Sequence, residues 1–514
     1  MKLIRLWPAL TTALGLLCLL QASIARADPG VRYVSTEPGC GGRSPCYRSI
    51  QAAVDAAEEG DEIRIAAGTY AGTSPATVDG RTYTQTVMIT KSLTLQGGYS
   101  VKDWSVLDPL TNPTVLDAQR RGRCISVVGQ WGSPPSVTLA GLVITGGDYT
   151  GLGNPPGVGE GVCGRAGTDC GGGLFAHAAT LVLRDSLLHD NIASRTRPFS
   201  DGGGAYLWQL RPGSRIENTA VISNAALGFG SSGGGLHVQY GADLVIADSS
   251  IGCNQAASEG GGIFVFQPAG KLTIERTTLG ENVAGQTGGA TTAYLTWQGE
   301  SLSLRRVIMT ENQAASGGAA LYLYKQGSGV TTVDLANVVL ADNRLTSPLS
   351  LGAVVEARGA RPDTSLALTM RHLTWAGQPA LPALGLAAAS GRAVSAVLTN
   401  TLIVSASHAF VGLQIAGDVR VEHSHTLAHS AGPLHTAVQG APVFLAVSPV
   451  SGDPRLDVKY RLQRGSAAID AGIACGADVD IDGHPRPVGR GYDIGADEWR
   501  ASGQQLPLLL KGRR

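Results

Sequence analysis

Charge is scarce in this chain of 514 residues, and the charges that are present cancel. Lys and Arg together number 40, as do Asp and Glu, and charged residues make up only 16% of the sequence. A chain without net charge lacks the basic surface that attracts nucleic acids or anionic membranes. We therefore expect neither of them as a partner.

Long apolar runs are also missing. Beyond the N-terminus, no segment has the roughly 18 consecutive apolar residues that a transmembrane helix needs. Residues 1–27 combine a basic head at Lys2 and Arg5, a short apolar run and the small pair Ala25 and Ala27, which is typical of a cleaved signal peptide. The alternative is a membrane anchor, for which the run is short. The sequence thus predicts an exported protein, secreted or at the cell surface, with no transmembrane span in its mature chain.

Cysteine is sparse as well, and its spacing excludes a zinc site. Export permits disulfides, and Cys40 with Cys46 and Cys163 with Cys170 are close enough in sequence to close small loops. The other cysteines of the mature chain have no obvious partners: Cys124, Cys253 and Cys475.

Glycine, by contrast, is abundant, and it marks a repeat. The chain has 70 glycines, about twice the usual share. Clusters open four clear units, such as GGGIFVFQPAGKLTIERTTLGEN, and looser copies follow from Gly288 and Gly317. An asparagine recurs near the end of each unit, every 28 to 33 residues: Asn191, Asn224, Asn254, Asn282, Asn312 and Asn343. Self-similarity at this period indicates a solenoid.

The pattern inside each unit predicts an all-β fold. Each unit holds about three short segments of alternating apolar and polar residues, which is typical of strands with one buried face. Such a unit fits one turn of a parallel β-helix better than a leucine-rich or helical repeat. Because each turn pairs with the next, the asparagines should form a ladder of amides bonded along the axis. We prefer this structural role to catalysis by any one of them.

Weaker repeats flank the array, so we predict one solenoid over residues 61–440. Residues 28–60 supply a strand and, in SIQAAVDAAEEG, a short helix whose apolar face would cap the first turn. Residues 441–500 form a C-terminal module, which we expect to be the end-piece of the solenoid, and residues 501–514 form a tail.

Three stretches resemble known proteins. YRSIQAAVDAAEEGDEIRIAAGTYAG looks like the start of pectin-lyase-like right-handed β-helix proteins, and the glycine-led units are similar to repeats of bacterial polymorphic surface proteins. The ending GSAAIDAGIACGADVDIDGHPRPVGRGYDIGADEW resembles the choice-of-anchor Q module of bacterial surface β-helix proteins. The resemblance implies a right-handed parallel β-helix at a bacterial surface, and it fixes no activity, because unrelated functions share this fold.

Many proteins of this fold cleave polysaccharides, so an enzyme is an open alternative. Equivalent side chains on adjacent turns lie about 4.8 Å apart, so a catalytic pair should appear as acidic residues at matched positions. The glycine-led first strands contain no such column. Acidic residues do recur in the second strands, where, with Arg305, they are typical of a solvated edge: Asp185, Glu217, Asp248 and Glu275. We therefore predict no catalytic residue.

The first strands instead carry aromatic residues at outward-facing positions. If Leu174 and its equivalents point inward, the residues between them point out and form a predicted exposed stripe. Its members are Phe175, His177, Tyr206, Trp208, His237, Gln239, Phe264, Phe266, Tyr322 and Tyr324, and Tyr294 would need a bulge to join them. Flat rings suit sugar faces, so we predict that the stripe binds an extended polysaccharide or a surface protein. The alternative is a structural stack covered by loops such as 147–171.

Half of a calcium motif stands near the C-terminus, in DVDIDG. Its three aspartates have the spacing of the first ligands of a calcium loop: Asp478, Asp480 and Asp482. The twelfth position is Gly489 instead of the required glutamate, although a looser calcium site with Asp493 or Asp497 stays open. The alternative is turn chemistry, in which the carboxylates accept backbone amides.

The sequence thus favours a secreted or cell-surface β-helix protein that binds an extended ligand, chiefly polysaccharide, or mediates adhesion. A polysaccharide lyase or glycoside hydrolase acting on an acidic glycan is the first alternative, and a rigid surface stalk is the second. Calcium is the one cofactor that the sequence suggests.

Overall fold

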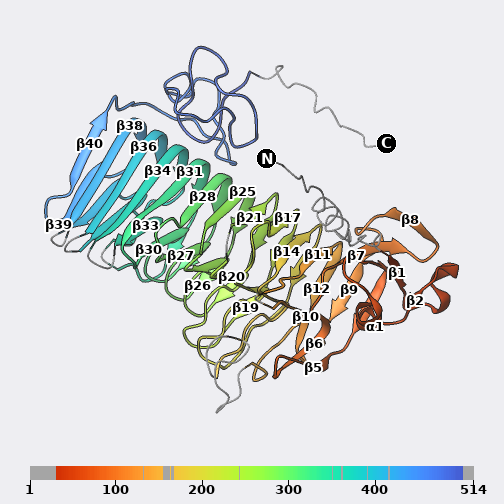
Figure 1. Ribbon diagram of the computed structural model, residues 1–514. Helices are drawn as coiled ribbons and strands as arrows, with labels where there is room; N and C mark the ends of the chain where they lie inside the picture. The colour runs from red at the N-terminus through yellow and green to blue at the C-terminus, as the bar shows by residue number, and fades with distance from the viewer. Residues whose placement is uncertain are drawn as a thin grey trace, which may run out of the picture.

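The protein is a right-handed parallel β-helix, as predicted: successive turns stack along one long axis (Figure 1). The computed structural model describes residues 30–501 except 131, 154–162, 164–166, 242, 350, 360–362, 390–391 and 415–416. The predicted signal peptide and residues 502–514 of the predicted tail lie outside the described residues. No helix among the described residues is long and apolar enough to cross a membrane.

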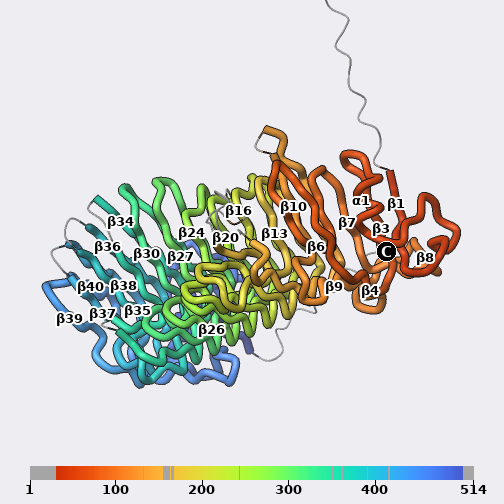
Figure 2. The backbone as a smooth tube through the Cα atoms, turned by 90° about the horizontal axis from the view of Figure 1, so that it is seen from below, coloured from red at the N-terminus to blue at the C-terminus, as the bar shows by residue number. Residues whose placement is uncertain are grey.

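Three sheets run along the axis, and we number them I to III. Sheet I has 13 strands, which lie side by side in Figure 2. They are β5 (Ser74–Val78), β6 (Arg81–Ile89), β10 (Arg123–Val128), β13 (Leu174–His177), β16 (Ala205–Trp208), β20 (Leu236–Gln239), β24 (Ile263–Phe266), β27 (Thr291–Leu295), β30 (Leu321–Lys325), β33 (Val355–Gly359), β35 (Leu384–Ala388), β37 (Phe410–Gln414) and β39 (His435–Gln439). Each pairs with its neighbour in parallel, apart from the antiparallel hairpin of β5 and β6.

Sheet II has 22 strands, and sheet III has five short ones. Sheet II contains β1 (Val31–Val34), β2 (Cys46–Tyr47), β3 (Glu62–Ala66), β4 (Gly68–Ala71), β7 (Leu93–Ser100), β8 (Asp103–Leu107), β9 (Thr114–Asp117), β11 (Ser136–Ala140), β12 (Leu142–Thr145), β14 (Thr180–Arg184), β15 (Leu187–His189), β17 (Arg215–Glu217), β18 (Ala220–Ile222), β21 (Leu244–Ala247), β22 (Ser250–Gly252), β25 (Lys271–Gly280), β28 (Ser301–Thr310), β31 (Gly329–Ala341), β34 (Thr364–Ala376), β36 (Arg392–Val404), β38 (Asp418–His429) and β40 (Val443–Val447). Sheet III contains β19 (Ala225–Ala226), β23 (Gln255–Ala256), β26 (Val283–Ala284), β29 (Gln313–Ala314) and β32 (Arg344–Leu345).

Each turn crosses sheet II in two segments that meet at a bend. The segments are separate strands in early turns and one bent strand from β25 onward. One residue at each bend has a positive φ, a conformation that changes the direction of the chain. These residues form a column along the axis, which we call the bend column: Asp185, Asn218, Asp248, Arg276, Arg306, Asn337, His372, Asn400 and His425.

Inward-facing apolar side chains fill the helix as one continuous core. In sheet I, for example, the ladder places Val127, Ala176, Leu207, Val238 and Val265 at the same inward position, and each is at most 1% exposed. Alternation at period two brings this position inward on every turn.

The six asparagines of the repeat form a continuous hydrogen-bonded ladder. Each Nδ2 donates to the Oδ1 of the next asparagine at 2.9 to 3.1 Å, from Asn191 to Asn343. The same Oδ1 accepts the backbone N–H of the preceding asparagine, as where Asn224 accepts from Asn191 at 3.1 Å. All six are at most 2% exposed. The ladder thus provides partners for polar groups that would otherwise be buried without them.

The predicted N-terminal cap is confirmed. Helix α1 (Ile50–Ala56) begins after Ser49, whose Oγ accepts the Ala52 N–H at 3.1 Å, and it follows the 3-10 helix η1 (Pro38–Gly42). It buries Ile50, Ala53 and Val54 against the first turn. The Gln51 side chain accepts the N–H of Met88 at 2.7 Å, which ties α1 to strand β6.

The two predicted disulfides are also confirmed. Cys40 bonds to Cys46, and Cys163 bonds to Cys170. The remaining described cysteines are free: Cys124, Cys253 and Cys475.

The C-terminal module is not the end-piece that we expected. Residues 441–447 still belong to the last turn, which ends in β40, and residues 448–501 fold back along the side of sheet II (Figure 1). There Ile481 and Ile494 pack against outward-facing apolar residues of the second segments, including Val339, Leu402 and Leu427. These residues need cover, and that need explains the lateral position of the module.

Candidate functional site

The predicted aromatic stripe forms two columns on the outer face of sheet I. The first column contains Phe175, Tyr206, His237, Phe264 and Tyr322, and the second contains His177, Trp208, Gln239, Phe266, Tyr294 and Tyr324. Rings follow one another along each column, as in the stacked pair of Tyr206 and His237 with centroids 4.6 Å apart. Tyr294 pairs in register with Phe266 and Tyr324, so the bulge that we expected is absent.

The stripe is less exposed than predicted. All five residues of the first column are buried, at 0 to 9% exposure, and those of the second column are half-buried. The cover comes from the segments that precede the glycine clusters. The disulfide of Cys163 and Cys170, for example, packs on Phe175 and Tyr206. Phe175, Tyr206, His237, Phe264 and Tyr322 therefore do not form an exposed surface.

A buried arginine fixes this cover at the N-terminal end of the stripe. The guanidinium of Arg123 donates to the carbonyl oxygen of Cys170 at 2.8 Å and lies 3.4 Å from the centroid of the Tyr149 ring and 4.7 Å from that of Phe175. Burial lowers the pKa of Arg123, and the surrounding rings and carbonyls compensate for the lost water. No ligand can reach Phe175 here without displacing the disulfide loop.

Further along the stripe a pocket of about 550 Å³ opens, which we call the aromatic pocket. The segments between the asparagine ladder and the glycine clusters are long at residues 192–201 and 225–232, and short at 255–259 and 283–287. The long segments form a wall, and the short ones leave Phe266 and Tyr294 accessible at its foot. A change in loop length along the repeat thus creates the hollow.

Two exposed rings stand at the mouth of the aromatic pocket. Phe199 is 41% exposed and Phe229 is 76% exposed, and they meet edge to face with centroids 6.2 Å apart. Exposed phenylalanines cost solvation free energy unless a ligand covers them. The sequence analysis missed both residues, although each lies just before a glycine cluster on consecutive turns.

Two carboxylates also line the aromatic pocket. Asp201 and Glu259 each directly precede a glycine cluster and lie two turns apart, which places them about 10 Å from each other. Asp201 Oδ1 accepts the N–H of Ser232 at 2.7 Å. Glu259 Oε1 accepts from the hydroxyl of Tyr294 at 2.5 Å, and burial raises the pKa of Glu259. The prediction of no acidic column considered only the strands and overlooked the residue before each cluster.

His237 lies between these groups without a charge. Burial lowers its pKa to about 3, a shift that its hydrogen bond with Gln239 partly opposes. The nearest carboxylate oxygen, Asp201 Oδ2, is 3.5 Å from Nδ1. A neutral imidazole has one nitrogen that donates and one that accepts a hydrogen bond, so it can bond a hydroxyl group of a ligand.

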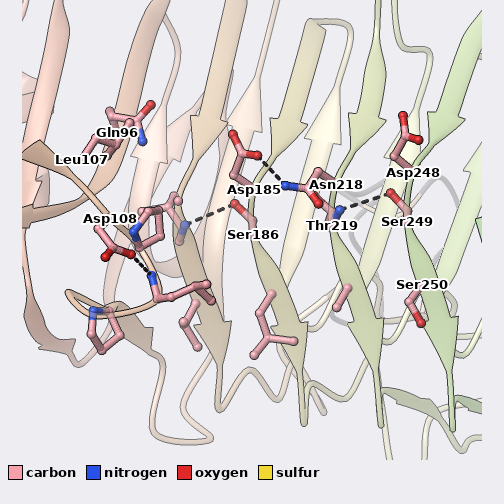
Figure 3. Close-up of a pocket in the computed structure, with 18 of the residues that line it drawn as sticks. Gln96, Leu107, Asp108, Asp185, Ser186, Asn218, Thr219, Asp248, Ser249 and Ser250 are labelled. Carbon is pink, nitrogen blue, oxygen red and sulfur yellow. Dashed lines mark hydrogen bonds between the residues drawn. The ribbon is translucent and has the colours of Figure 1, made fainter. Parts of the chain in front are cut away.

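A second hollow is larger than the aromatic pocket, but no aromatic side chain lines it. It covers about 1060 Å³ along the bend column, between the loop of Leu107 to Pro113 and Arg276 (Figure 3). Its polar side chains already bond one another: Asn218 donates to Asp185 at 2.7 Å, and Arg276 donates to Asp248 at 2.6 Å. Because aromatic rings line only the first of these two hollows, we regard the aromatic pocket as the better candidate site.

The candidate calcium ligands are engaged in turns and an ion pair. Asp480 is fully buried, and its Oδ1 accepts the N–H groups of Asp482 and His484 at 2.9 and 2.8 Å. Asp482 pairs with Arg461 at 2.7 Å, and Asp478 is exposed. Ligand atoms of Asp480, Asp482 and His484 lie within 4.8 Å of one another, but the contacts match the turn chemistry that we gave as the alternative.

Comparison with known proteins adds little beyond the fold. No protein-family model matches the sequence, and no curated protein matches it. A solved structure that resembles the chain is the crystal structure of pectate lyase Pel9A, with a TM-score of 0.44 and 12% identity, over 92% of this chain and 97% of that chain. The strand pairing itself establishes that the chain is a right-handed parallel β-helix.

Proposed function

We propose that this protein binds a neutral polysaccharide in the aromatic pocket. The observation that carries the proposal is the exposed pair of Phe199 and Phe229 beside the polar groups of Asp201, His237 and Gln239. Rings provide flat apolar contact with sugar faces, while the polar groups bond hydroxyls at the ring edge.

The charge of the lining favours a neutral glycan. Asp201 and Glu259 line the aromatic pocket, and neither Lys nor Arg does so among the described residues. A uronate would meet like charges without a compensating cation, which costs binding free energy. This argues against the acidic glycan that the sequence analysis had left open as an enzyme substrate.

Glycan binding can be tested with paired ring substitutions. We expect Phe229→Ala with Phe266→Ala to weaken binding of neutral oligosaccharides at least tenfold in isothermal titration, after a glycan array identifies the ligand. Trp297→Ala is the matched control, because Trp297 is 55% exposed and does not line the aromatic pocket. Equal affinities of the double variant and the wild type, with unchanged circular dichroism, would refute the proposal.

A second candidate function is hydrolysis of the same glycan. Asp201 and Glu259 have backbones about 10 Å apart, from which their side chains can reach the separation used by inverting glycosidases, in which one acid protonates the leaving oxygen and a carboxylate activates water. Glu259, with its raised pKa, suits the acid, and Asp201 suits the base. Glu259→Gln should then bind glycan but release no reducing ends, and an inactive wild type on every bound glycan would exclude hydrolysis.

We infer export and a surface location from the predicted signal peptide, and the two disulfides are compatible with an extracellular protein. The choice-of-anchor Q resemblance, adhesion to a surface protein and a bound calcium ion stay predictions. Mass spectrometry of the protein from culture medium and cell envelope would test export through a mature N-terminus near Asp28.

A further inference from the structure

The two ends of the solenoid are finished differently. At the N-terminal end α1 covers the first turn. At the C-terminal end the module lies to the side, and the last strands carry four exposed apolar side chains: Val438 at 45%, Val443 at 44%, Leu445 at 41% and Val447 at 59%. The three on β40 pair with Arg420, Glu422 and Ser424 and therefore lie on the outer face of sheet II, while no element among the described residues caps the core at this end.

Strand β40 is also an open edge. Among the described residues it pairs only with β38, so one row of its backbone groups has no strand partner. A long apolar edge of this kind is a template for a further strand. Natural solenoids cover such an edge with charge, proline or a capping element, and β40 itself contains none of these.

We propose that a second copy of this chain covers the open end, with β40 pairing antiparallel to β40 of that copy about a two-fold axis at Leu445. A head-to-tail stack is blocked, because α1 occupies the other end. Two β40 edges can therefore meet only about a two-fold axis. That arrangement uses both edges and so closes the assembly as a dimer.

The sequence of β40 is complementary to itself in this register. With Leu445 opposite Leu445 of the second copy, Val443 lies opposite Val447, and Phe444 lies opposite Ala446. The facing positions contain no charged residue, and the large Phe444 meets a small partner. The pairing extends the β38–β40 ladder across the axis, so it continues sheet II of one copy into sheet II of the other.

Sedimentation equilibrium of the purified full chain tests the proposal. We expect a dimer whose dissociation constant rises at least tenfold in Leu445→Lys, because lysine at an edge strand opposes pairing. Val458→Lys is the control, since Val458 is 94% exposed on the module, and it should leave the dissociation constant unchanged. A wild type that is monomeric at all concentrations, or a dimer that Leu445→Lys leaves intact, would overturn the proposal.

A cross-linking experiment covers the case in which the lysine variant misfolds. A two-fold axis brings residue 445 to its own counterpart, within the Cα distance that a disulfide spans. In a Cys253→Ser background, which removes the exposed cysteine, Leu445→Cys should form a covalent dimer under mild oxidation. If Leu445→Cys cross-links no more than Val458→Cys in the same background, the two-fold pairing is wrong.

Discussion

The bend column is exposed to solvent in one half of the molecule and covered by the C-terminal module in the other. In the open half, Asp185 bonds Asn218 along the axis (Figure 3), and Asp248 bonds Arg276. In the covered half, the equivalent side chains bond the backbone of the module. Asn337 donates to the Val479 oxygen at 2.7 Å and Asn400 to the Ile473 oxygen at 2.7 Å.

The difference lies in the neighbouring outward positions of the second segments. In the open half they include Leu187, Ala220, Ser250 and Thr278, and in the covered half Val339, Thr374, Leu402 and Leu427, so the covered half is the more apolar. Apolar positions drive burial, while polar side chains at the bend give the docked segment its register.

We expect the largest loss of stability when the buried ion pair inside the C-terminal module is broken. Arg486 donates to Glu498 at 2.7 Å, and both side chains are fully buried. Arg486→Ala leaves an unpaired buried carboxylate and should lower the free energy of unfolding by about 3–5 kcal/mol in a denaturant titration. Limited proteolysis should then cut the module first. Arg461→Ala, at a partly exposed pair, is the control and should cost about 1 kcal/mol or less.

A substitution at Asn400 should show how strongly the stability of the covered half depends on the side chains of the bend column. Asn400→Ala removes the bonds to both backbone groups of Ile473 and should cost about 2–4 kcal/mol, including roughly 1 kcal/mol for alanine at positive φ. Asn218→Ala also places alanine at a positive φ, but the hydrogen bond that it removes, to Asp185, is exposed to solvent. The free energy of unfolding should therefore fall by only about 1 kcal/mol. Equal losses in the two variants would contradict the comparison.

We expect low pH to reduce the free energy of unfolding through His372, which lies in the covered half. Burial lowers the pKa of His372 to about 3. Below pH 6.5 its imidazole is therefore protonated in the unfolded chain but stays neutral in the native state. The contribution of His372 is therefore complete above pH 6.5 and falls by about 1.4 kcal/mol per pH unit below it. Asp493, whose pKa burial raises to about 7, contributes with the opposite sign.

The difference between wild type and His372→Gln isolates this histidine, because both chains retain Asp493. The advantage of the wild type should decrease as the pH falls from 7 to 4 in thermal denaturation. A difference that does not vary with pH would show that His372 does not titrate as its burial implies.

The smallest effect is expected in the open half. Arg276→Ala removes an exposed pair with Asp248 and should change the free energy of unfolding by less than about 1 kcal/mol. Added salt should remove most of that difference, because exposed pairs are screened. A larger or salt-independent loss would indicate that the open half is also an interface.

The repeat made the fold predictable, because glycine clusters and asparagines recur at structurally equivalent positions. The position of the module was harder to predict, since it depends on side chains outside the module. The pattern was present in the sequence: VVLA in β31 and LIV in β36 are continuous apolar runs, which indicate burial on both faces.

The candidate site was predicted only in part. The predicted stripe and the aromatic pocket both lie on sheet I, but loop length decides which rings are covered, and alternation contains no information about loops. Asp201 and Glu259 were overlooked because they belong to turns, where side-chain direction depends on the backbone.

The lateral position of the module also has a mechanical consequence. The module bonds Arg306, Asn337, His372 and Asn400, which belong to four different turns, and Trp499 packs near Leu402 at its end. Tension applied to the chain at Ala501 would therefore load these turns together, in shear along the solenoid. The last turn would not be peeled away first, and rupture would require several bonds to fail at once.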